Sequence, residues 1–87
     1  MPNPGEPPAE ETAILRLLDE AGGKTISPMD VAVALSTNAE WHRHIQAVRR
    51  TAVQLALEGR LVIYRKGKPV DPNDFKGVYR LGLPRQD

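Results

Sequence analysis

Hydrophobic side chains recur at helical spacing in three segments of the first two thirds of the chain. In residues 9–21 they occupy one face of the pattern, and Glu10 and Glu11 stand in the first turn, where the helix dipole favours acidic groups. Gly22 and Gly23 follow and end the pattern. We therefore expect a first helix over 9–21 with one buried face.

The second helical segment begins at a recognisable start signal, the run Ser-Pro-Met-Asp at residues 27–30. Ser27 suits the N-cap, and Pro28 suits the first helical position because its missing N–H needs no partner there. Asp30 can accept a hydrogen bond from the Ser27 amide, as the third residue of a capping box does. The segment is apolar on nearly all sides as far as Leu35, so we expect a short helix that is buried on several sides.

The longest helical pattern covers residues 40–59 and has two different sides. An apolar side centred on Trp41 predicts burial. Its other members are Ile45, Val48, Ala52, Leu55 and Ala56. The opposite side is polar and basic and has no acid before Glu58; it comprises Arg43, Gln46, Arg50 and Gln54, with Arg49 at its boundary. This composition is typical of a helix that binds phosphates and base edges.

A four-residue polar connection, 36–39, joins the second and third helical segments, and Thr37 or Asn38 within it can cap the third. A short helix, a short turn and a longer helix with a basic side follow the order of a helix-turn-helix. Other three-helix arrangements produce the same order, so this pattern alone leaves the choice open.

After residue 59 the pattern changes from helical to extended. Residues 60–65 and 78–83 are rich in β-branched and aromatic side chains and are predicted to be strands, and 66–77 hold the Gly, Pro, Asn and Asp of a loop. Residues 24–26 are extended enough for a short strand or bridge. The chain is therefore predicted to be α+β and mostly helical: a winged helix-turn-helix of three helices followed by a β-hairpin, with 66–77 as the wing.

Several short runs also resemble a known family. They are Thr25-Ile26-Ser27-Pro28, Val31-Ala32, Trp41, Val48-Arg49, Ala52, Gly59-Arg60, Lys66-Gly67-Lys68-Pro69-Val70-Asp71-Pro72 and the closing residues 77–81. Over residues 14–83 the chain resembles a bacterial family of small winged-helix proteins catalogued as a domain of unknown function. The wing run is the most specific element. The resemblance implies the fold and no activity. Relatives often carry Cys at the position of Ser27. Because this chain has Ser there, any thiol role at this position is removed.

The length of 87 residues leaves room for one domain, which we place at 9–84. About two-thirds of the surface of the extended chain would be buried, as an upper estimate. Residues 1–8 hold four prolines and are expected to form a disordered tail, and 85–87 a flexible C-terminus. The sequence has no cysteine, no apolar signal core and no run long enough to span a bilayer. We expect a cytoplasmic protein without a membrane partner.

Charge is divided unevenly along the chain. Residues 1–39 hold two Lys or Arg and six Asp or Glu, whereas residues 40–87 hold ten and five. A basic surface built from the third helix and the wing is therefore plausible. The overall isoelectric point near 8.1 lies below the value of about 9 that marks a strongly basic domain, so this evidence is weak.

The residues that often carry catalysis or bind metals have simpler explanations here. His42 and His44 lie about 200° apart around a helix and cannot hold one ion together. Asp71 and Asp74 flank Pro-Asn and suit a turn. The sequence shows neither a Gly-rich phosphate loop nor a nucleophile with an orienting base. We expect no enzyme, no catalytic residue, no metal and no cofactor. Trp41 is assigned to the core, and Tyr64 and Tyr79 are expected to face each other across the hairpin.

The sequence leaves two functions open. In the first, the domain binds duplex DNA, with helix 40–59 toward the major groove and wing 66–77 toward the backbone or a neighbouring groove. The candidate contacts are Arg43, Gln46, Arg49, Arg50, Lys66 and Lys68. In the second, the domain is a protein-protein interaction or homodimerisation module without nucleic-acid binding, because Val53 and Leu57 place apolar groups on the otherwise polar flank of the helix.

Overall fold

The computed structural model describes residues 9–36 and 40–84. The expected N-terminal tail, the flexible C-terminus and the cap at Thr37 or Asn38 lie outside these residues.

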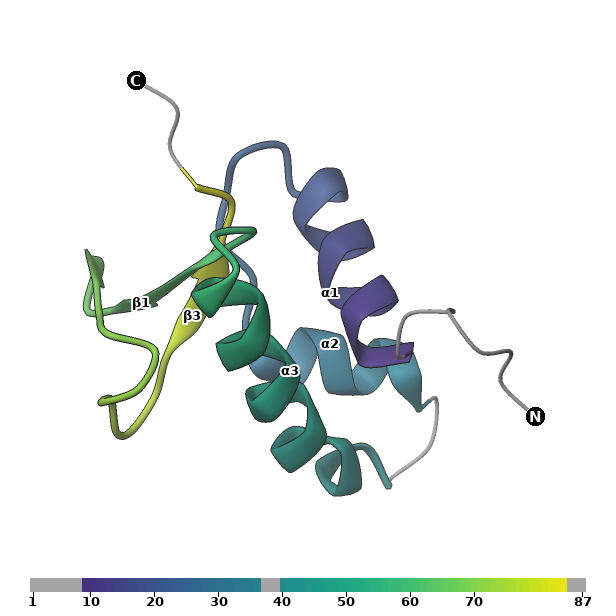
Figure 1. Cartoon of the computed structure of the whole chain (residues 1–87). Helices are drawn as coiled ribbons and strands as arrows, with labels where there is room; N and C mark the ends of the chain where they lie inside the picture. Colours follow the sequence, from purple (N-terminus) through teal and green to yellow (C-terminus); the bar gives the residue numbers. More distant parts are fainter. Residues whose placement is uncertain (1–8, 37–39, 85–87) are drawn as a thin grey trace.

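Three α-helices form a little under half of the described chain. They are α1 (Ala9–Glu20), α2 (Pro28–Leu35) and α3 (Ile45–Leu57), and a short 3-10 helix, η1 (Trp41–His44), leads into α3. Figure 1 shows the three α-helices packed together, with the β-strands to one side of α3. This arrangement confirms the predicted α+β class, three helices followed by strands, and is compatible with a winged helix.

The capping box of α2 is present as predicted. The Ser27 hydroxyl accepts a hydrogen bond from the Asp30 amide at 3.1 Å, and the Asp30 carboxylate accepts one from the Ser27 amide at 3.0 Å. The expectation that α2 is buried on several sides was wrong. Although Val31 and other residues on one face are fully buried, Met29 and Val33 are 50% and 47% exposed, because α1 and α3 cover one side of this helix and leave the other to solvent.

The predicted helix over 40–59 is divided at its start. The first four residues form η1, in which the Arg43 amide donates to the Glu40 carbonyl at 3.0 Å, a pairing three residues apart. The Glu40 side chain does not cap this end. A tight 3-10 turn is common where an α-helix begins. Arg43 therefore belongs to η1, whereas Gln46 and Arg50 belong to α3.

The strands form a three-stranded antiparallel sheet. Strand β1 (Val62–Arg65) lies in the centre, with β2 (Lys68–Pro69) on one side and β3 (Arg80–Gly82) on the other. A single bridge joins Ile26 to Leu81, which confirms the strand or bridge predicted at 24–26. Through this bridge the segment before α2 is attached to the edge of the sheet.

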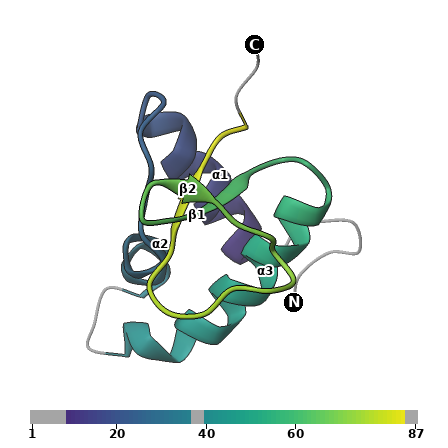
Figure 2. The ribbon, with the colours of Figure 1, turned by 90° about the vertical axis from the view of Figure 1, so that its left-hand side faces the viewer.

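The wing differs from the single loop that was expected over 66–77. Lys66 and Gly67 form a two-residue turn between β1 and β2, and their positive φ angles of 52° and 80° match the type I′ turn that favours tight hairpins. Residues 70–79, here called the return loop, then lead back to β3. Figure 2 shows this loop passing in front of α3.

The core lies between the helices and one face of the sheet. Its largest fully buried side chains are Ile14, Leu18, Val31, Val48, Leu55, Leu61, Ile63 and Leu81. Trp41, expected at the centre of the buried side, is only half-buried. Tyr64 and Tyr79 do not face each other as expected: Tyr64 lies opposite Arg80 in the β1–β3 register, whereas Tyr79 is buried with its ring centroid 5.1 Å from that of Phe75.

Candidate functional site on the third helix and the wing

The solvent side of η1 and α3 brings together three of the predicted contact residues. Arg43, Gln46 and Arg50 are all exposed. Their spacing of three and four residues places them in one row along the helix. The opposite side of α3 holds the buried Val48, Ala52 and Leu55. We call the row the basic stripe.

Among the described residues, few groups bind the cations of the basic stripe. The Arg43 guanidinium lies 3.8 Å from the Glu40 carboxylate, and these side chains are 76% and 60% exposed. Exposed ion pairs of this kind are weak and screened by salt. Arg50 has no hydrogen bond or ion pair with the described residues. Glu58 follows the last residue of α3 and lies beyond the C-terminal end of the stripe. Its carboxylate accepts a hydrogen bond from the Gln54 side chain at 3.0 Å.

Arg49 lies beside the basic stripe and is used inside the domain. Its Nη2 donates to the Phe75 carbonyl oxygen at 3.0 Å, and its guanidinium carbon lies 4.2 Å from the centre of the Phe75 ring and 5.8 Å from that of Tyr79. Arg49 is half-buried. These contacts hold the return loop against α3, so Arg49 has a structural place that the sequence did not indicate.

The same loop is anchored by buried aromatic rings. The hydroxyl of Tyr79 is buried and has no hydrogen-bond partner in the described structure. Burial raises the pKa of the Tyr79 phenol above its ordinary 10.0, and the Arg49 charge partly opposes this. Tyr79 therefore stays neutral at physiological pH, and its ring packs in the core.

The wing carries three exposed lysines. Lys66 and Lys68 lie at the turn between β1 and β2, as the sequence suggested. Lys76, which the sequence pattern did not single out, follows Phe75 directly and lies in the segment that Arg49 holds against α3. An aromatic residue within an otherwise polar loop was the available signal, because it predicts an anchored segment. Of these lysines, Lys76 belongs to the part of the wing attached to α3.

Asp71 stabilises a local turn in the wing. The Asp71 carboxylate accepts from the Asn73 amide at 2.9 Å, and its carbonyl accepts from the Asp74 amide at 3.0 Å. This confirms the predicted turn at Asp71. Within residues 9–36 and 40–84, no group of three or more His, Cys, Asp or Glu is placed to hold a metal ion.

The two candidates for a partner interface have different environments. Val53 is half-buried and packs against the core, whereas Leu57 is 54% exposed. The structure thus leaves Leu57 available on the surface and uses Val53 largely for packing.

Among the described helices, none is long and apolar enough to cross a membrane.

Comparison with known proteins places the chain in a family. No curated protein matches the chain. The model of the family described as "Protein of unknown function (DUF3253)" matches residues 8–84, nearly the whole sequence, and the chain therefore belongs to this family.

Proposed function

We propose that the domain binds duplex DNA through the basic stripe, with the wing lysines contacting backbone phosphates. The observation that carries the proposal is the exposed row of Arg43, Gln46 and Arg50 on the third helix of a fold compatible with a winged helix. In helix-turn-helix proteins, the N-terminal part of this helix meets base edges. The row occupies η1 and the first half of α3, which together form the N-terminal part of the third helix.

The chemistry of the row suits this role. Arg can donate two parallel hydrogen bonds to a phosphate or to guanine, and Gln can pair with adenine in the major groove. With only three such side chains on the helix, we expect weak binding with little sequence preference for a monomer and tighter binding for a dimer. Phosphate contacts then supply most of the affinity.

The test is a titration of short random-sequence duplex DNA at several salt concentrations. Replacing Arg43 and Arg50 together by Ala should weaken binding, and the logarithmic salt dependence should become shallower by about one for each phosphate that is no longer neutralised. The matched control is the double replacement Arg16→Ala and Lys24→Ala, which removes the same charge from residues outside the stripe. Absence of salt-sensitive binding in the unmodified protein, or an equal loss in the control, would refute the proposal.

A second candidate function is supported by Leu57. A large apolar side chain that is 54% exposed, beyond the C-terminal end of the basic stripe, favours a protein partner or a second copy of the chain. Leu57→Asp should then abolish association while thermal unfolding stays nearly unchanged. Val53→Asp is less informative, because Val53 packs against the core. Sedimentation that shows a strict monomer, together with failure to recover any partner, would argue against this function.

A further inference from the structure

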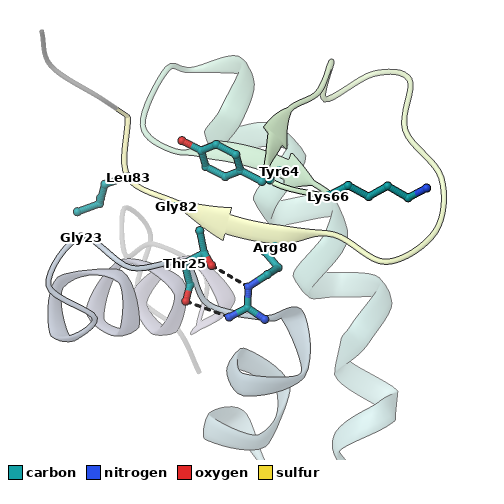
Figure 3. Close-up of a pocket in the computed structure, with 8 residues that line it drawn as sticks. Gly23, Thr25, Tyr64, Lys66, Arg80, Gly82 and Leu83 are labelled. Atoms are coloured by element: carbon teal, nitrogen blue, oxygen red, sulfur yellow. Dashed lines mark hydrogen bonds between the residues drawn. The ribbon is translucent and has the colours of Figure 1, made fainter.

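The face of the sheet that points away from the core carries a hollow of about 220 Å³. Ile63 and Leu81 are buried on the core side. Side chains alternate along a strand, so Tyr64 and Arg80, which are opposite each other in the β1–β3 register, rise from the other face. They line the hollow together with Thr25, Lys66, Gly82 and Leu83, and Figure 3 shows these residues.

The guanidinium of Arg80 is held in a fixed orientation. Its Nε donates to the Thr25 hydroxyl at 2.7 Å, and its Nη2 donates to the Thr25 carbonyl at 3.1 Å. These two bonds use one edge of a planar group that has five donors, and the remaining donors have no partner among the described residues. A guanidinium can bind a carboxylate or a phosphate with two parallel hydrogen bonds. Arg80 forms no ion pair with an acid of the described chain.

The ring of Tyr64 lies against the backbone of Gly82. A Cβ atom added at Gly82 would stand 2.9 Å from Tyr64 Cε2, so the ring can take this position only because residue 82 is glycine. Leu83, which is 43% exposed, adds apolar surface at the same end of the hollow. The half-buried ring therefore presents a flat surface on which another ring can stack.

The charge of the hollow is entirely positive. The lining residues include Arg80 and Lys66 and no acid, although Figure 3 shows the Lys66 ammonium extending away from Tyr64 and Arg80. An arrangement of one oriented guanidinium and one aromatic surface combines recognition of an anion with recognition of a ring. The hollow is smaller than the 300 Å³ or so at which pockets for drug-sized molecules begin.

We propose that the open face of the sheet binds a small planar anion, whose ring stacks on Tyr64 and whose carboxylate or phosphate pairs with Arg80. The site is formed by the sheet and the segment before α2, so it does not depend on DNA binding by α3. Aromatic carboxylates and nucleoside monophosphates share this chemistry.

Nuclear magnetic resonance titration of the full chain, labelled with ¹⁵N, tests the site. Benzoate and adenosine monophosphate represent the two ligand sources, and inorganic phosphate and adenosine represent the isolated anion and the isolated ring. We expect saturable shifts of the amides of Thr25, Gly67 and Gly82 with one or both ring-bearing anions. The anion that binds more tightly identifies the ligand class, an aromatic carboxylate or a nucleoside monophosphate. Phosphate or adenosine alone should bind at least about tenfold more weakly, because each lacks one of the two recognition groups.

Variants separate the two kinds of recognition. Arg80→Lys keeps the charge but removes the oriented edge and should weaken binding about tenfold, the loss of a hydrogen bond to a charged group. Thr25→Val removes the hydroxyl that accepts from Arg80 Nε, leaves the bond from Nη2 to the Thr25 carbonyl in place, and should weaken binding by a smaller factor in the same direction. Tyr64→Leu should reduce binding of ring-bearing anions to the level of phosphate. Arg16→Ala, on α1, should change nothing.

Three results would overturn the proposal. One is the absence of saturable shifts at ligand concentrations of about 10 mM, well above a millimolar dissociation constant. Another is equal binding of phosphate and of the ring-bearing anions. The third is unchanged affinity in both Arg80→Lys and Thr25→Val, with spectra that show both variants to be folded.

Discussion

Arg49 on α3 and Phe75 in the return loop are joined twice, by a hydrogen bond of 3.0 Å from Nη2 to the Phe75 carbonyl and by a guanidinium carbon 4.2 Å above the Phe75 ring. The return loop has no regular secondary structure of its own. The loop is held to β1 by the Arg65 Nε, which donates to the Val78 carbonyl at 3.0 Å, and to α3 by the contacts among Arg49, Phe75 and Tyr79.

The first prediction concerns this contact. Arg49→Ala should lower the free energy of unfolding by about 1 to 2 kcal/mol, because it removes a hydrogen bond from a charged donor and a stacked cation. Phe75→Leu should also destabilise the domain, and the double variant should lose less than the sum of the two. Urea unfolding measures each value. Arg50→Ala, at the neighbouring exposed position, is the control and should stay within about 0.5 kcal/mol of the unmodified protein. Additive losses would show that the two residues do not interact energetically.

The second prediction concerns the buried hydroxyl of Tyr79. Because this hydroxyl has no hydrogen-bond partner in the described structure, Tyr79→Phe removes an unsatisfied polar group and keeps the ring. We expect stability to be unchanged or raised by up to about 1 kcal/mol. Tyr79→Leu, which also removes the ring that packs on Phe75, should destabilise the domain. A clear loss of stability in Tyr79→Phe would show that the hydroxyl is satisfied in solution.

The third prediction is a pH dependence from the same residue. The pKa of Tyr79 is raised in the folded protein by burial, with partial opposition from Arg49, whereas in the unfolded chain it is near 10. The folded state thus retains the phenol proton at pH values where the unfolded state releases it, and stability falls as the pH rises above about 10. Below that pH the Tyr79 phenol is protonated in both states and adds no pH dependence to the stability. The difference in stability between the unmodified protein and Tyr79→Phe should change only above pH 10 or so. A difference that stays constant up to pH 11.5 or so would contradict the raised pKa.

The order of elements and the cap of α2 were predictable because they depend on local sequence. Ser27 and Asp30 are three residues apart, and their hydrogen bonds need no distant partner. The same holds for the buried row of α3, which follows from helical spacing. Membership in a family of unknown function followed from short runs of sequence for the same reason.

What local sequence did not predict concerns features set by contacts between distant segments. Helical spacing places Arg49 at the boundary of the basic side, and its bond to the return loop, 26 residues further on, could not be predicted from that spacing. The exposure of Val33 depends on how much of α2 the other helices cover. The division of the wing depends on Lys66, which adopts a positive φ that is uncommon for a side chain larger than glycine. Arg80 could not be singled out because its partner, Thr25, is 55 residues away in sequence.

The fourth prediction tests the cap of α2. Ser27→Ala removes the acceptor for the Asp30 amide and should cost about 1 kcal/mol of stability. Ser27→Asp, which can still cap, should cost less. Thr12→Ala, at an exposed position inside α1, is the control and should have little effect. If Ser27→Ala were as stable as the unmodified protein, the hydrogen bond would contribute nothing measurable.

The last prediction separates the two parts of the wing, and it rests on the proposed DNA binding. Lys76 follows the residue that Arg49 holds against α3, whereas Lys66 lies at the turn between β1 and β2. A lysine attached to the helix that carries the basic stripe binds the same DNA segment with less loss of conformational freedom. Lys76→Ala should therefore weaken DNA binding more than Lys66→Ala, and removal of a phosphate-binding lysine should reduce the logarithmic salt slope by about one. Each variant removes one positive charge from the wing, so the two serve as controls for each other. Equal effects would indicate a general electrostatic attraction, and a larger effect of Lys66 would assign phosphate binding to the β1–β2 turn.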